Sequence, residues 1–216
     1  MLLVVAATEM ELLPVRERLA HAAEVECLVC GVGPVEAATR LTAHLARRPG
    51  NYRLVILCGV AGAYPEAGPQ LLDLCLAERE VLGDLGLVAG EEISPLAPEL
   101  GVQREFSLDA GWRAKAATLL ANRQSPCRVG TFVTVNSASA TASRGRALRD
   151  RFQAICENME GAAVARACQE FAVPCLEVRA VSNYVEDRDL ARWRLREACQ
   201  QAAEAAALFA ATFAVD

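Results

Sequence analysis

Two acids and one amide stand where an α/β protein would bring them to a ligand. Glu160 opens a run of small residues in the segment Glu-Asn-Met-Glu-Gly-Ala-Ala at 157–163, and Asn183 ends the apolar run at 178–182. Glu11 follows another apolar run, at residues 2–7. A carboxylate accepts protons or hydrogen bonds, whereas an amide both donates and accepts. An acid at a helix start paired with an amide at a strand end suggests a site for a nucleoside.

Apolar runs alternate with amphipathic segments, which predicts strands and helices in turn. We expect strands at residues 2–7, 25–30, 54–58, 71–78, 128–135 and 175–182, and helices at 9–20, 35–47, 110–122, 161–171 and 191–213. Residues 83–103 contain Gly and Pro and predict a loop. Near-continuous apolar strands indicate a sheet that is covered on both faces. The predicted fold is a three-layer α/β/α arrangement around a mixed, mostly parallel twisted sheet.

Small residues follow several of the predicted strands. They are Gly-Val-Gly at 31–33, Gly-Val-Ala-Gly at 59–62 and the pair Ser182-Asn183, while Ala-Thr-Glu-Met-Glu occupies 7–11. Ligands of such sheets lie beyond the carboxyl ends of the strands. The small residues leave space there, and the polar side chains are expected to point into it.

Composition narrows the classes of function. The 216 residues are 53% hydrophobic and 23% charged, which fits one domain over residues 1–216. A net charge of −5 argues against a nucleic-acid partner. The opening apolar run lacks a basic leader, and no run of about 18 uncharged apolar residues follows. We expect a cytoplasmic protein with a small-molecule partner.

Nine cysteines raise the question of a metal or redox site. Cys27 and Cys30 have CxxC spacing, but there is no second CxxC and the chain has only two His. Most of the cysteines fall in apolar segments, where a reduced thiol behaves as a small hydrophobic group. Buried structural thiols are the favoured interpretation, with a zinc or redox role for the CxxC pair as the alternative.

The ordered set of motifs resembles the nucleoside phosphorylase and nucleosidase superfamily, and within it the futalosine hydrolases most. The resemblance runs from Ala7 to Trp193 and rests on the segments at 7–11, 31–33, 59–62 and 157–163 and on Arg-Ala-Val-Ser-Asn-Tyr-Val-Glu-Asp-Arg-Asp at 179–189. It implies a nucleoside phosphorylase-like fold and cleavage of an N-glycosidic bond through a cationic, oxocarbenium-like sugar. It implies no metal and no organic cofactor.

By this resemblance Glu11 activates the attacking water and is a catalytic residue. The alternative is an ordinary acid in the first turn of a helix, where it complements the helix dipole. Glu9 lies two residues earlier and is expected to face solvent. Glu160 matches the acid that binds the ribose hydroxyls, with Met159 packed against the sugar. The alternative for Glu160 is a helix N-terminal acid without a ligand.

Asn183 is the second predicted catalytic residue. Adenine nucleosidases of the superfamily carry Asp at the matching position, and the amide here suits the N7 and O6 edge of a 6-oxopurine better. The resemblance therefore implies release of hypoxanthine from futalosine, a step of menaquinone biosynthesis. Against this stands the interpretation that Asn183 only ends a strand in a turn.

Other assignments are weaker. Ala61, Gly62, Val135 and Ser182 are predicted to border the substrate, with a plain turn as the alternative for the first two. Arg179 is expected to pair with an acid such as Glu157. Arg188 and Trp193 are candidate lid residues; solvated loop charge and helix packing are equally compatible with them.

Hydrolysis is favoured over phosphorolysis, because a carboxylate at Glu11 would repel phosphate. The alternative is phosphorolysis, with the Gly-rich turn at 31–33 as the anion site. One rival is a nucleosidase for 5′-methylthioadenosine, S-adenosylhomocysteine or 6-amino-6-deoxyfutalosine, and another is a non-catalytic nucleoside-binding protein. The resemblance also implies a homo-oligomer, a dimer or higher, for which residues 83–107 are the candidate contact.

Overall fold

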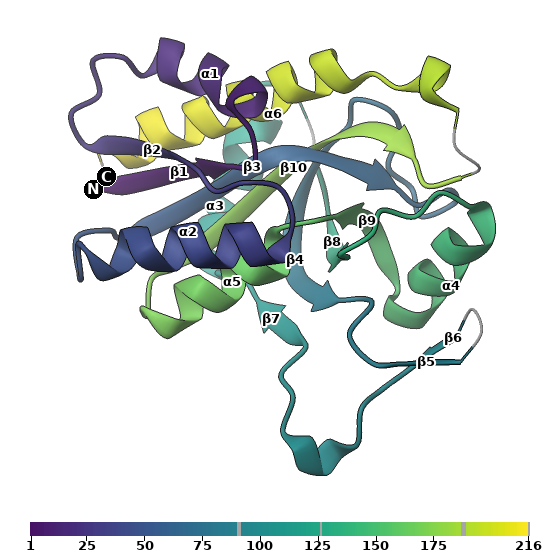
Figure 1. Ribbon diagram of the computed structural model, residues 1–216. Coiled ribbons are helices and arrows are strands. Elements are labelled where there is room, and N and C mark those ends of the chain that lie inside the picture. The colour runs from purple at the N-terminus through teal and green to yellow at the C-terminus, as the bar shows by residue number, and fades with distance from the viewer. Residues whose placement is uncertain (90–91, 126, 187–188, 216) are drawn as a thin grey trace.

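A computed structural model describes residues 1–89, 92–125, 127–186 and 189–215 (Figure 1). Its strands are β1 Leu2–Ala6, β2 Val25–Val29, β3 Leu54–Ala63, β4 Leu74–Leu82, β5 Leu87–Ala89, β6 Glu92–Ser94, β7 Glu105–Ser107, β8 Cys127–Thr134, β9 Ala154–Asn158 and β10 Cys175–Tyr184. Its helices are α1 Glu9–Arg18, α2 Pro34–Ala46, α3 Ala110–Asn122, α4 Ala142–Phe152, α5 Gly161–Glu170 and α6 Leu195–Phe213, with 3-10 turns at Pro98–Leu100 and Leu190–Arg192.

Eight of the strands form one sheet in which β3 is central. β2, β1 and β3 run parallel, and β10 runs parallel to β3 on its other side. From β10 the sheet continues through an antiparallel β4 and then through β8 and β9. β9 returns to the end of β3, where Gly62 and Ala63 pair with it in antiparallel register. The far half of the sheet thus curls into a ring, which places β9 and β10 on opposite flanks of the end of β3.

Helices cover the sheet on two faces (Figure 1). Leu2 and Val4 of β1 pack in a core with α1, α3 and α6, whereas Leu3 and Val5 pack in a core with α2 and α5. Successive side chains of a strand point to opposite faces, so both sets of β1 residues are buried. This explains the near-continuous apolar runs and confirms the predicted three-layer α/β/α class with a mixed, mostly parallel sheet.

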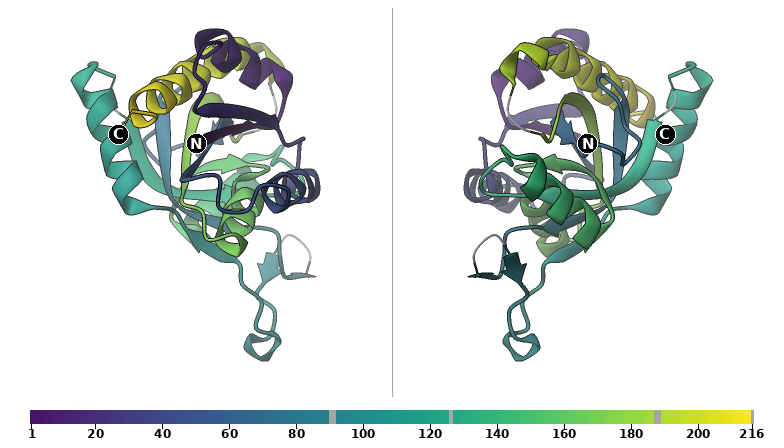
Figure 2. Two further views of the ribbon diagram at one scale, coloured as in Figure 1. Left: turned by 90° about the vertical axis from the view of Figure 1, so that its left-hand side faces the viewer. Right: turned by 90° about the vertical axis from the view of Figure 1, so that its right-hand side faces the viewer.

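Several predicted boundaries were wrong. The helix α4 and the strand β9 were not predicted, β3 continues to Ala63, and α6 begins at Leu195. The predicted loop at 83–103 contains the β5–β6 hairpin and a 3-10 turn. Residues 84–89 and 92–104, here called the arm, project away from the sheet (Figure 2). In the described residues, no helix has the length and apolar character needed to cross a membrane.

Candidate active site

A cavity of about 330 Å³ opens where the ends of β1, β3, β9 and β10 meet. It receives side chains from the start of α1, from the loop at 138–140, and from residues before and within α6. Most of the predicted site residues line it: Glu11, Ala61, Gly62, Met159, Glu160, Ser182, Asn183 and Trp193. The structure thus gathers into one space residues that are up to 182 positions apart in the chain, from 11 to 193.

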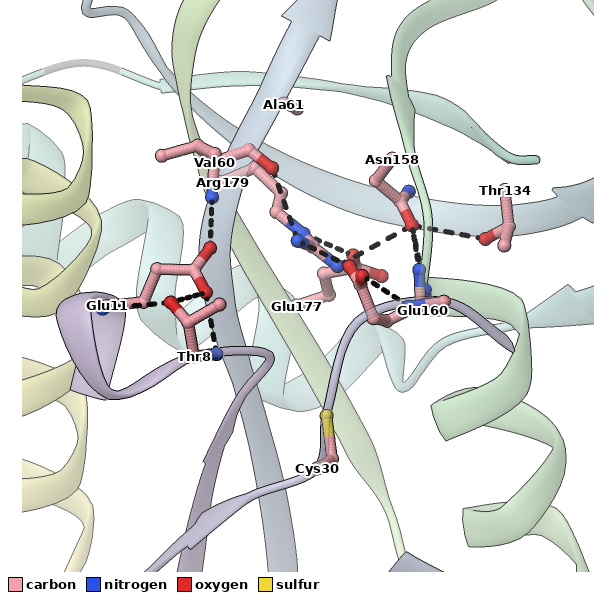
Figure 3. A network of polar contacts seen from close by, with 12 residues as sticks. Thr8, Glu11, Cys30, Val60, Ala61, Thr134, Asn158, Glu160, Glu177 and Arg179 are labelled. Atoms are coloured by element: carbon pink, nitrogen blue, oxygen red, sulfur yellow. Dashed lines mark hydrogen bonds and ion pairs between the residues drawn. The ribbon is translucent and has the colours of Figure 1, made fainter. Parts of the chain in front are cut away.

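Glu11 is both a helix cap and a cavity residue. It is the third residue of α1, and with Thr8 it forms a capping box in which Glu11 Oε2 accepts from the Thr8 N–H at 3.0 Å and from Thr8 Oγ1 at 2.8 Å. Glu11 Oε1 accepts from the Val60 N–H at 3.2 Å. Figure 3 shows this carboxylate held between α1 and β3. Glu9 is exposed, as predicted, and pairs with Arg16 at 2.7 Å.

The close approach of Glu11 to β3 requires a glycine. A β-carbon on Gly59 would lie 2.6 Å from Glu11 Oε1 and 2.9 Å from Arg179 Nη1, nearer than side-chain carbons are found. Glycine at this position lets both charged groups reach the backbone of β3. The predicted role of the Gly-rich segment at 59–62 is therefore refined, because it lies inside β3 rather than in a turn after it.

Glu160 is held from two sides and is 4% exposed. Its Oε1 accepts from the Gly33 N–H at 3.1 Å, and its Oε2 accepts from Arg179 Nη1 at 3.2 Å. Gly33 has a φ of 90°, in the left-handed region that favours glycine, which turns its N–H toward Glu160. The Gly-Val-Gly segment thus serves the carboxylate of Glu160.

Arg179 pairs with acids, as predicted, but its partners are Glu177 and Glu160 and not Glu157, the acid named as an example. Arg179 donates from Nε to Glu177 Oε1 at 2.8 Å and from Nη1 to Glu160. Glu177 lies two residues before Arg179 in β10, and side chains two apart in a strand share a face. That period was the available signal for the correct partner. Arg179 also donates from Nη1 to the carbonyl of Val60 at 3.2 Å, which ties it to β3.

Asn183 lies within β10 rather than in a turn beyond it, after an irregularity in the strand register that follows Val181. Its Oδ1 accepts from Ser182 Oγ at 2.7 Å, and its Nδ2 donates to the carbonyl of Tyr184 at 3.1 Å. Asn183 pairs in register with Gly62 of β3. A β-carbon on Gly62 would lie 3.2 Å from Asn183 Nδ2 and 2.8 Å from Val185 Cγ2, so the Asn183 amide packs where Gly62 has no side chain.

Glu157 is a cavity residue that the sequence interpretation did not assign to the substrate. It pairs with Gly62 from the β9 side, across β3 from Asn183. Its carboxylate accepts from the Ser139 N–H at 2.7 Å, from Ser139 Oγ at 2.6 Å and from Tyr64 Oη at 3.3 Å. Burial raises the pKa of the Glu157 carboxyl, and the Ser139 hydrogen bonds oppose that rise. The small residues at 137–140 were the sequence signal for this loop.

Not every predicted residue reaches the cavity. Val135 is absent from the cavity wall; it is fully buried in an apolar cluster with Tyr64 and Leu148. Thr134, one residue earlier, instead faces the polar groups beneath the cavity (Figure 3). Trp193 lines the cavity between the second 3-10 turn and α6. Arg188 lies outside the described residues.

The cysteines are mostly buried and all nine are free thiols. Burial is the main cause that raises the pKa of Cys27, and it raises the pKa of Cys30 to about 12. A thiol of this kind is a poor nucleophile and a poor metal ligand, because both roles need the thiolate. The burial and raised pKa of Cys30 agree with the structural interpretation of the CxxC pair.

Comparison with known proteins identifies the family. A model of the phosphorylase superfamily matches residues 6–214. The chain is 42% identical to futalosine hydrolase of Thermus thermophilus over 184 residues, 82% of this chain and 77% of the relative. It is 35% identical to futalosine hydrolase of Streptomyces coelicolor, over 80% of this chain and 73% of the relative.

Solved structures agree on the fold. A 5′-methylthioadenosine/S-adenosylhomocysteine nucleosidase of Helicobacter pylori superposes with a TM-score of 0.87 at 20% identity, covering 98% of this chain and 97% of the other. The relatives are nucleosidases, and the predicted resemblance is confirmed. The chain belongs to the phosphorylase superfamily and, within it, to the futalosine hydrolases.

Proposed function

We propose that the chain hydrolyses the N-glycosidic bond of futalosine and releases hypoxanthine and dehypoxanthine futalosine. The observation that carries the proposal is the meeting of Glu11, Glu160 and Asn183 in one cavity. A water oxygen bonds to C1′ while the bond from C1′ to the purine nitrogen breaks. The bonding electrons leave with the purine, and Glu11 takes a proton from the water. The released purine then takes up a proton by way of solvent.

The charge of Glu11 and Glu160 suits this reaction. The sugar becomes cationic as the bond breaks, and carboxylates fixed beside it stabilise that charge without reorganising. Each oxygen of Glu160 accepts one hydrogen bond from the protein, which leaves acceptor capacity for the ribose hydroxyls. Met159 lines the same part of the cavity and packs against the sugar.

Recognition of the base follows from the pair that flanks Gly62. Asn183 and Glu157 stand on either side of this residue, about two strand spacings apart, roughly 9.5 Å. A 6-oxopurine offers acceptors at N7 and O6 and a donor at N1, whereas adenine offers a donor at its amino group and an acceptor at N1. Nδ2 of Asn183 donates to the N7 and O6 edge, and Glu157 accepts from the N1 proton.

Adenine would bring its N1 lone pair toward the Glu157 carboxylate. A buried mismatch of this kind leaves polar groups unpaired and can cost a factor on the order of 10⁴ in kcat/KM. Glu157→Gln and Asn183→Asp should each reduce the ratio of kcat/KM for the 6-oxopurine substrate to kcat/KM for the adenine substrate. The matched control is Glu66→Gln, because Glu66 is an exposed acid that does not line the cavity.

Two features favour water over phosphate as the nucleophile. The Gly33 N–H, at the start of α2, already donates to Glu160 and is not free to bind an anion. Glu11 lies beside the reacting position and would repel a phosphate dianion. We therefore assign hydrolysis rather than phosphorolysis.

The test is release of base from four nucleosides in the absence of phosphate: futalosine, inosine, 5′-methylthioadenosine and 6-amino-6-deoxyfutalosine. Hypoxanthine from futalosine, quantified by chromatography, is the expected result. Adenine release would move the assignment to the adenine nucleosidases. Release only after phosphate is added would overturn the role of Glu11, and binding without release from any substrate would indicate a nucleoside-binding protein.

We further propose that the chain acts in the cytoplasm as one domain and assembles as a homo-oligomer through the arm. Leu87 and Leu100 of the arm are 60% and 64% exposed, and covering them would remove apolar surface from water. Sedimentation velocity should give a dimer or higher assembly, and Leu100→Asp should shift it toward the monomer. The control is Leu190→Asp, which alters a residue that is equally exposed, at 61%, outside the arm.

A further inference from the structure

Two fully buried acids lie beneath the cavity without lining it. Glu80 of β4 and Glu177 of β10 are both 0% exposed, and β4 and β10 are neighbouring strands. A β-carbon on Gly161, the first residue of α5, would lie 1.9 Å from Glu80 Oε1 and 2.8 Å from Glu177 Oε1. The two carboxyl groups therefore border the same point in space.

If both carboxyl groups of this pair were ionised, one of their oxygens would have no hydrogen-bond donor. Glu80 accepts from Asn158 Nδ2 at 2.6 Å and from Thr134 Oγ1 at 2.7 Å, and Glu177 Oε1 accepts from Arg179 Nε. Glu177 Oε2 is buried and lacks a donor among the described groups. A proton on Glu80 supplies that donor, because a protonated carboxyl has an O–H to give.

The excess of buried carboxyl groups over buried cations also favours a proton on Glu80. Among the buried residues that the structure describes, five carboxyl groups accompany one cation, Arg179. Burying an unpaired carboxylate is energetically unfavourable, so such groups take up protons instead. Burial raises the pKa of the Glu80 carboxyl well above its ordinary value, and the charge of Glu177 adds to the rise. Burial raises the pKa of the Glu177 carboxyl as well, but the bonded Arg179 opposes that rise and favours the ionised form of Glu177, which leaves the proton on Glu80.

Two chains of contacts lead from this pair to Glu160. One passes from Glu177 through Arg179 to the Glu160 carboxylate. The other passes from Glu80 to Asn158, whose Oδ1 accepts from the Glu160 N–H at 2.9 Å and from the Gly161 N–H at 2.7 Å. Figure 3 shows Glu177, Arg179, Asn158 and Glu160 as one connected network. Both the side chain and the backbone of Glu160 are thus fixed from below.

We propose that Glu80 and Glu177 share one proton, and that this acid and carboxylate pair positions Glu160 for the ribose through Arg179 and Asn158. Glu80 and Glu177 are positioning residues, since neither lines the cavity. The role of Glu160 toward ribose rests on the proposed function. The shared proton does not, because it follows from the buried geometry of the pair alone.

The first experiment asks where the proton is and needs no substrate. Infrared spectra of the folded protein with carbon-13-labelled Glu should contain a protonated carboxyl C=O band at neutral pH, distinct from carboxylate bands. The band should lose intensity in Glu80→Gln and keep it in Glu78→Gln, the same change on an exposed residue of β4. Glu157, whose pKa burial also raises, is present in all three proteins and cancels in the difference. A spectrum without a protonated carboxyl at neutral pH, or a band of equal intensity in wild type and Glu80→Gln, would overturn the shared proton.

The second experiment measures futalosine hydrolysis as a function of pH. Glu80→Gln keeps an N–H donor toward Glu177, so kcat/KM should stay within about tenfold of wild type. Glu80→Ala leaves Glu177 and Asn158 without this partner, and displacement of Glu160 should lower kcat/KM by on the order of 10²-fold. Wild type should lose activity at alkaline pH as the shared proton leaves, and Glu80→Gln should lack that limb.

Other titratable groups near the Glu80 and Glu177 pair could also cause a loss of activity at alkaline pH. Arg179 of β10, Tyr64 after β3 and the thiol of Cys175 interact with Glu80 itself, and Glu160 and the thiol of Cys156 interact with its partner Glu177. All of them remain in Glu80→Gln, so only the proton of Glu80 is removed. Equal losses in Glu80→Gln and Glu80→Ala, or identical alkaline limbs in Glu80→Gln and wild type, would refute the positioning role. Failure of wild type to hydrolyse futalosine would refute the proposed function and leave the infrared result standing.

Discussion

Glu11 caps a helix and also lines the cavity. As the third residue of α1 it completes the capping box with Thr8, and from the same place its Oε1 borders the cavity. The two interpretations of this acid that the sequence left open are therefore compatible. The catalytic role stays a prediction, while the capping role is seen directly.

Replacement of Glu11 separates these roles. Glu11→Gln keeps the capping box, because Gln serves at the third helical position as Glu does. Its NH2 group then faces the Val60 N–H in place of an accepting oxygen, so the free energy of unfolding should fall by about 1–3 kcal/mol. The amide cannot accept the proton of water, and kcat should fall by about 10²- to 10⁴-fold with KM little altered. Steady-state kinetics and thermal melts check both expectations. Glu9→Gln is the control, since Glu9 is exposed; a matching loss in that variant would contradict the assignment.

Gly161 shows how one residue is dictated by packing. Glu80 and Glu177 occupy the space where a β-carbon would stand, with Glu80 Oε1 only 1.9 Å away. Gly161→Ala should therefore strain the buried pair and lower the free energy of unfolding by about 1–3 kcal/mol. Urea unfolding measures this. Gly111→Ala, at the exposed second residue of α3, would place a β-carbon 3.3 Å from Asp109 Oδ1 and should change the free energy of unfolding by less than about 1 kcal/mol. Equal shifts in both variants would exclude the steric cause.

At the scale of elements, strongly apolar strands were predictable and the elements of the polar middle region were not. The strands β1 and β10 were predictable because their residues are almost continuously apolar. In contrast α4 has Arg at 144, 146, 149 and 151, and buries only Gly145, Leu148 and Phe152. β9 is five residues long and ends in the polar Glu157 and Asn158. Short or weakly apolar segments take their structure from tertiary pairing, which local sequence does not encode.

The same reasoning explains which site residues were predictable. Glu11, Glu160 and Asn183 belong to motifs at the ends of apolar runs, so their meeting in one cavity follows from the topology of a parallel sheet. The position of Val135 depends on how the end of β8 pairs with β9, and the role of Glu157 depends on how β9 pairs with β3. That contact joins only Gly62 and Ala63 to β9, and it arises from closure of the sheet rather than from any local pattern.

The start of α1 allows a test at this scale. Thr8→Ala removes the N-cap and should cost about 1 kcal/mol of stability. It also removes a donor to Glu11 Oε2, so kcat should fall as well, and Thr8→Ser should restore both. Asp109→Ala removes the N-cap of α3, which lies outside the cavity. That variant should lose similar stability and keep its kcat in the same assays; a parallel fall in kcat would mean that general destabilisation, and not the orientation of Glu11, limits the rate.

For the whole molecule, closure of the sheet around β3 explains why so much charge is buried. β9 and β10 meet β3 from opposite sides, and Arg179 of β10 bonds there to Glu177, to Glu160 and to the Val60 carbonyl of β3. In the proposed function these carboxylates stand beside a cationic sugar, and burying them there costs folding stability. The cost is linked to protons, and it can be measured through pH.

Glu80 gives this linkage a definite sign. Its pKa is raised in the folded protein, chiefly by burial, so between the ordinary Glu value and the folded value the native state binds more protons than the unfolded chain. The free energy of unfolding should consequently fall as pH rises through that window. Urea titrations from about pH 5 to about pH 8 should show a steeper fall in wild type than in Glu80→Gln. His44, whose pKa burial lowers, acts in the opposite direction, but it is present in both proteins and cancels in the difference. Parallel curves for the two proteins would mean that Glu80 carries no extra proton in the native state.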